Sequence, residues 1–135
     1  MMKRRRGTQR LARPGRHVGF ERLVERALAG IPSPFLGALA EVAIVIDDLP
    51  TRDQLRENDL DPDDTLYGLY EGVPRTEYGA DWVAAPNRIT LFRLPLEEDF
   101  PDPDDLADEV RITVIHELAH HLGIDDDRLT ELGVD

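Results

Sequence analysis

The sequence predicts an α+β domain, because a chain of 135 residues, a length that suits one domain, contains both helical and strand patterns. Residues 20–29 carry apolar side chains at helical spacing. Residues 42–46 form a continuous run rich in β-branched side chains, which is typical of a buried strand. The long stretch that follows Pro103 repeats apolar side chains along one stripe, as a helix packed on a core does. These three stretches carry the fold-class prediction.

Shorter elements are expected between these three. Ser33-Pro34 has the pattern of a helix start, with serine as the N-cap and proline in the first turn, and predicts a short helix to about Ala40. Further predicted elements are a helical turn near 53–56, a strand at 66–70, and a hairpin formed by 82–85 and 88–93.

The long helix has clear start and stop signals. Asp102 is suited to cap its N-terminus, and Pro103 fits the first helical position. Gly123 can adopt the left-handed conformation that ends helices. The predicted core stripe consists of Leu106, Val110, Val114 and Leu118. A short final helix is expected at 128–133.

The end of this helix carries a metal-binding pattern, H-E-x-x-H-x-x-G-x-x-D, from His116 to Asp126. His116 and His120 are four residues apart, so both can direct a ring nitrogen at one zinc ion. Glu117 projects about 100° round the helix from His116, where it can act as a general base without coordinating the metal. After Gly123 the chain can turn back and bring Asp126 to the zinc as a third ligand.

The third ligand is the open part of this pattern. Asp125, Asp126 and Asp127 precede the final helix, where an aspartate can also serve as the N-cap. Asp126 fits the ligand spacing. Glu131 is the only glutamate after the motif, and it ranks second as a ligand because it follows the motif too closely. Glu109 is either a support for a ligand histidine or a solvent-exposed side chain. His121 falls off the metal-binding face and is left outside the predicted site.

The motif resembles that of the zincin metallopeptidases. With aspartate at the last position it is similar to the snapalysin type, and more so to a group of small bacterial zincin-like metallopeptidases. Members of that group also carry stretches like 20–24, 66–72 and 87–92, so the resemblance covers about residues 18–133. It implies a zincin-like α+β fold with helices on a small mixed sheet. It also implies zinc ligands at His116, His120 and Asp126, with Glu117 as the catalytic base.

Two further expectations follow from the resemblance. Metzincins place a methionine turn beneath the metal, but the only methionines here are Met1 and Met2, so the floor of the site must be built otherwise. In zincins an edge strand borders the cleft and pairs with extended substrate. The candidate for that strand is 88–93, with Ile89 and Leu91 as substrate-binding residues, and an ordinary structural strand is the other interpretation.

Composition limits the remaining possibilities. The chain has no cysteine, which excludes disulfides and thiolate zinc sites. It has no apolar run near the roughly 20 residues that span a membrane, and no apolar stretch follows its basic start, so we expect a cytoplasmic protein.

Charge divides the chain into a basic arm and an acidic body. Residues 1–16 hold seven basic residues and no acid, whereas all 28 acidic residues lie in 17–135. We expect residues 1–16 to form a flexible arm, acting as a solubilising tail rather than as a nucleic-acid anchor, and 17–135 to form the zincin-like domain.

The sequence therefore predicts a zinc metallopeptidase that acts on peptides or proteins through a zinc-activated water, with Glu117 as the base. The alternative is a zinc-binding regulatory or interaction protein without turnover, tethered to nucleic acid by its arm. Metal binding alone does not require Glu117, which favours the enzyme. The sequence does not indicate the substrate specificity or the oligomeric state.

Overall fold

The computed structural model describes residues 18–72 and 87–132. It has the expected α+β composition. The helices are α1 (Val18–Ala29), α2 (Phe35–Ala38), the 3-10 helix η1 (Leu39–Glu41), α3 (Arg52–Glu57), α4 (Arg93–Asp99), α5 (Pro103–Leu122) and α6 (Asp126–Leu132). The strands are β1 (Ala43–Asp47), β2 (Gly68–Glu71) and β3 (Arg88–Phe92). The basic arm and the expected strand at 82–85 lie outside the described residues.

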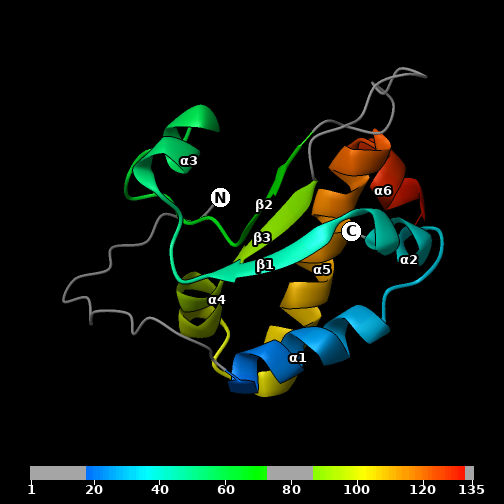
Figure 1. Ribbon diagram of the computed structural model, residues 1–135, viewed down its shortest axis with the longest axis horizontal. Coiled ribbons are helices and arrows are strands. Elements are labelled where there is room, and N and C mark those ends of the chain that lie inside the picture. Colours follow the sequence, from blue (N-terminus) through cyan, green and yellow to red (C-terminus); the bar gives the residue numbers. More distant parts are fainter. Residues whose placement is uncertain (1–17, 73–86, 133–135) are drawn as a thin grey trace.

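The described strands form one small mixed sheet in the order β1-β3-β2 (Figure 1). β3 pairs with β1 in parallel and with β2 in antiparallel orientation. The expectation that β3 is an edge strand is therefore wrong. Both of its sides are occupied by neighbouring strands, and Ile89 and Leu91 are fully buried in the core, so neither side chain is open to a substrate.

The two edge positions of the described sheet belong to β1 and β2. β1 was expected to be buried, but Ala43 and Asp47 are exposed and its central residues are half-buried. Its β-branched run is partly uncovered because β1 has a strand neighbour on one side only. β2 is the edge strand that lies beside α5 (Figure 1).

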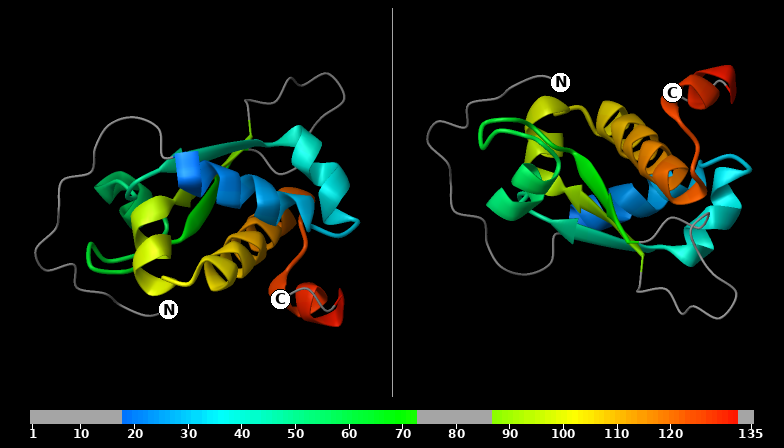
Figure 2. Two further views of the ribbon diagram at one scale, coloured as in Figure 1. Left: turned by 90° about the horizontal axis from the view of Figure 1, so that it is seen from below. Right: turned by 90° about the horizontal axis from the view of Figure 1, so that it is seen from above.

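A layer of two helices, α1 and α5, covers one face of the sheet (Figures 1 and 2). The expected α5 stripe is buried against this sheet and α1. The core includes Phe20, Val24, Ala27, Ile89, Leu91, Leu106, Val110, Val114 and Leu118. None of the helices among the described residues combines the length and the apolar character of a bilayer-spanning segment.

The ends of α5 match the signals in the sequence. The Asp102 side chain accepts hydrogen bonds from the backbone N–H groups of Asp104 and Asp105. Gly123 has φ 73° and ψ 27°, and the Ile124 N–H bonds to the Ala119 carbonyl at 2.8 Å. This left-handed ending stops the helix directly after the motif and lets the chain turn into α6.

The start of α2 was predicted wrongly, and α4 was not predicted. Ser33 is not the cap of α2: Pro34 occupies that position, and no side chain caps the helix. α4 was not expected, because Pro95 masks the helical pattern of a short segment. Proline is tolerated there because it lies in the first turn, where its missing N–H has no helical partner.

Candidate active site

The side chains of the motif lie on the last two turns of α5. His116 is half-buried, and its Nδ1 lies 3.0 Å from the Ile112 carbonyl oxygen of the preceding turn. Because a carbonyl oxygen only accepts, Nδ1 carries the proton and donates it there. The lone pair of Nε2 is then available to a metal ion.

Glu117 is held in place by the neighbouring strand. The Tyr70 N–H of β2 donates to Glu117 Oε1 at 2.8 Å, and His120 Nδ1 lies 3.4 Å from the same oxygen. The Tyr67 carbonyl accepts a hydrogen bond from the Phe92 N–H of β3. Backbone groups of successive residues in a strand point alternately towards and away from the partner strand, so Tyr70, three residues later, directs its N–H away from β3. The Glu117 carboxylate therefore lies at the outer edge of β2, with its side chain 15% exposed.

The aspartates after Gly123 have different surroundings. Asp125 accepts the Arg128 N–H at 2.9 Å and is the N-terminal cap of the last helix. Asp126 is the first residue of α6, but its side chain lies outside the described part of the structure. Asp127 is exposed, and Glu131 pairs with Arg128 at 3.1 Å.

No group of three or more described His, Asp or Glu side chains is placed to hold a metal. The histidines of the motif provide two nitrogen donors. The protonation of His116 at Nδ1 suits it to bind a metal through Nε2. The side chain of Asp126, the third ligand expected from the motif, lies outside the described residues.

His121 was left out of the predicted site, but the structure connects it to Glu117 through Tyr70. Its ring is fully buried, with Nε2 at 2.6 Å from Glu41 Oε1 and Nδ1 at 3.2 Å from the Tyr70 hydroxyl. The Tyr70 hydroxyl also donates to Asn87 Oδ1 at 3.0 Å. These residues are far apart in the sequence and form no motif. The one local signal was the position of His121 directly after His120 of the motif.

Glu109 lies about two turns before His116 on the same helix. Its side chain is half-buried, and burial raises the pKa of its carboxyl above the ordinary 4.5, against smaller lowering effects of a hydrogen bond from Thr113 and the charge of His116. The Thr113 hydroxyl is 3.5 Å from Glu109 Oε2. Glu109 is therefore not simply a solvent-exposed side chain.

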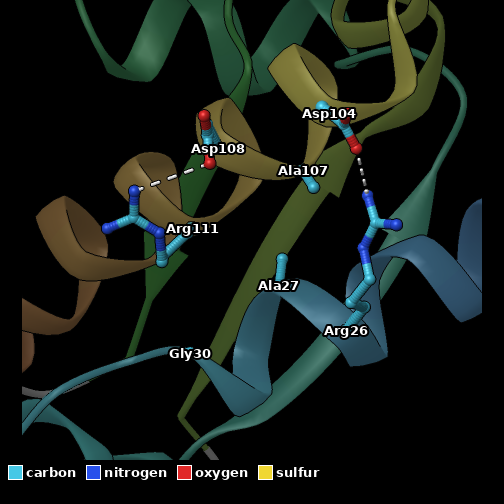
Figure 3. A pocket seen from close by; sticks show the side chains of 7 residues that line it. All are labelled: Arg26, Ala27, Gly30, Asp104, Ala107, Asp108 and Arg111. Carbon is cyan, nitrogen blue, oxygen red and sulfur yellow. Dashed lines mark hydrogen bonds and ion pairs between the residues drawn. The ribbon is translucent and has the colours of Figure 1, made fainter.

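A cavity of about 310 Å³ lies between α1 and the first half of α5 (Figure 3). Its two arginines already pair with acids on α5, Arg26 with Asp104 at 3.5 Å and Arg111 with Asp108 at 3.7 Å. The motif lies on the last two turns of the same helix. The cavity is thus separate from the candidate site.

Comparison with known proteins agrees with the α+β fold. The sequence profile of one family, described as zincin-like metallopeptidase, matches residues 39–134. The match includes all three described strands and the complete motif. No curated protein matches the chain.

Proposed function

The chain belongs to the zincin-like metallopeptidase family, and from this premise we propose that it is a zinc-dependent peptidase with Glu117 as its general base. Members of the family typically use zinc and hydrolyse peptide bonds. The observation that carries the proposal for this chain is the position of Glu117, between His120 of the metal-binding pair and the Tyr70 N–H.

We propose His116, His120 and Asp126 as the zinc ligands. The hydrogen bond from His116 Nδ1 to Ile112 supports this set, because it fixes the tautomer whose Nε2 can coordinate. Asp125 is engaged as a cap and Glu131 as an ion-pair partner, which favours Asp126 over both. Bound zinc would supply a Lewis acid for the scissile carbonyl and for the attacking water.

The role proposed for Glu117 is proton transfer. Its Oε1 accepts the Tyr70 N–H, and this bond orients the carboxylate. The carboxylate takes the proton of the attacking water and returns it to the amine that leaves when the peptide C–N bond breaks. Substrates are peptides or proteins.

Replacement of Glu117 by glutamine tests this role. Glu117→Gln keeps the size of the side chain and an oxygen that can accept the Tyr70 N–H, but removes the base. We expect zinc content near that of the wild type and cleavage of a mixed peptide library reduced by at least about 100-fold. Cleavage is measured by mass spectrometry, with and without a chelator.

Asp108→Asn is the matched control, because it neutralises an exposed acid on the same helix away from the motif. It should cleave like the wild type. Unchanged cleavage by Glu117→Gln contradicts the base assignment. A wild type that binds zinc but cleaves no peptide in the library contradicts the peptidase proposal and supports a regulatory zinc protein.

A further inference from the structure

Tyr70 contacts both Glu117, the proposed base, and His121, which has no part in the proposed reaction. Its backbone N–H holds the Glu117 carboxylate, and its hydroxyl contacts the buried ring of His121. The rings of Tyr70 and His121 are also in contact, with centroids 5.7 Å apart. Tyr70 therefore links the buried His121 ring to the strand position that orients Glu117.

His121 is itself fixed from the opposite side. A carboxylate only accepts hydrogen bonds, so the contact of 2.6 Å means that His121 Nε2–H donates to Glu41. This bond sets the plane of the ring and directs Nδ1 at the Tyr70 hydroxyl, whose single proton is shared between Nδ1 at 3.2 Å and Asn87 Oδ1 at 3.0 Å. Glu41 belongs to η1, so the contacts connect η1, α5 and β2 in one chain of hydrogen bonds.

The surroundings of Asn87 show how closely this arrangement is packed. A Cβ built on Gly72 would lie 2.1 Å from Asn87 Oδ1, the atom that accepts the Tyr70 hydroxyl. Gly72 also has φ 148°, which other residues rarely adopt. Only glycine at this position leaves Asn87 room to reach Tyr70.

We propose that Glu41, His121 and Tyr70 form a positioning relay that holds the edge of β2 against Glu117. The relay keeps the Tyr70 N–H aimed at Oε1 and so restricts the carboxylate to one orientation. The inference deepens the proposed function and rests on it for its effect on turnover. Its structural part concerns one hydrogen bond and can be tested without metal or substrate.

Tyr70→Phe is the test variant, because it removes the hydroxyl and keeps both the ring and the backbone N–H. Tyr67→Phe is the matched control: Tyr67 lies just before β2, is similarly half-buried and donates its hydroxyl to Asp99, away from Glu117. The first measurement is amide hydrogen exchange at residue 70 in the metal-free protein. We expect exchange about tenfold faster in Tyr70→Phe than in the wild type and unchanged in Tyr67→Phe.

The second measurement is turnover. In Tyr70→Phe we expect kcat to fall about tenfold, within the range typical when an outer partner of a site is lost, while KM and zinc content stay near wild-type values. Glu41→Gln should lower kcat in the same direction, because it weakens the bond that orients His121. Tyr67→Phe should keep the kcat of the wild type.

The outcomes separate the relay from the peptidase proposal. If the wild type cleaves no peptide, the peptidase proposal fails, and the exchange rate at residue 70 still decides whether the relay exists. Wild-type exchange at residue 70 in Tyr70→Phe overturns the relay. So does a loss of kcat that is equal in Tyr70→Phe and Tyr67→Phe, because that result reflects general destabilisation.

Discussion

Asp126 is the residue on which the proposed metal site depends most. Asp126→Ala should weaken zinc binding by more than about 100-fold, because a ligand is lost rather than an outer partner. Asp127→Ala and Glu131→Ala should bind zinc like the wild type. Affinity is measured by competition with a chromogenic chelator.

Asp125→Ala is the informative control for this series. Loss of the cap to Arg128 should reduce stability by about 1 kcal/mol while zinc affinity stays near that of the wild type. Release of zinc by Glu131→Ala but not by Asp126→Ala would contradict the proposed ligand set.

Glu109 gives a prediction about pH. Its raised pKa means that the folded protein favours the protonated carboxyl, so its contribution to stability is fully present below the unfolded pKa, near 4.5, and is lost as pH rises through the folded pKa. Glu109→Gln should therefore raise the Tm of the metal-free protein at pH 7 and flatten the decline of Tm as pH rises above 4.5. Glu57→Gln, at an exposed glutamate, should leave this profile unchanged.

Thermal unfolding followed by circular dichroism across that pH range measures the effect. A lower Tm for Glu109→Gln at pH 7 would mean that the ionised carboxylate stabilises the fold. The hydrogen bond from Thr113 would then outweigh the cost of burial.

At the scale of elements, the site depends on the close approach of β2 to α5. A Cβ built on Gly68 would lie 2.5 Å from Thr113 Cγ2, which is too close without movement of the strand or the side chain. Gly68→Ala should cost about 1–3 kcal/mol of stability through overpacking and should lower kcat by displacing Tyr70. Chemical denaturation measures the stability.

A double-mutant cycle separates this contact from other effects of the substitution. Thr113→Ala removes the opposing methyl group, so adding it to Gly68→Ala should recover part of the lost stability. Gly19→Ala is the control, because a Cβ there meets nothing within 4 Å. Equal losses with and without Thr113→Ala would contradict the close approach as the cause.

The elements differ in how far the sequence could predict them. α5 was predicted with its cap, its stripe and its stop, because each depends on neighbours within a few residues. The order of the strands was not predicted. The residues of β3 identify it as a strand, but they do not indicate which two strands pair with it. The contact between Tyr70 and His121 could not be predicted for the same reason, because the two residues are 51 positions apart in the chain.

At the scale of the whole molecule, the motif and the family were predictable because they are local and specific. The match over residues 39–134 confirms the resemblance that the sequence carries. The expected division into a basic arm and an acidic body stays a prediction, since residues 1–16 lie outside the described part.

The central claim is that this chain holds a catalytic zinc, and metal analysis of the purified protein tests it most directly. After dialysis against zinc and then against metal-free buffer, we expect about one zinc per chain by elemental analysis. Retention should fall as pH drops, because protonated histidines do not coordinate. His116→Ala and His120→Ala should each abolish retention. A wild type that retains no zinc at pH 7.5, or variants that retain as much as the wild type, would contradict the account.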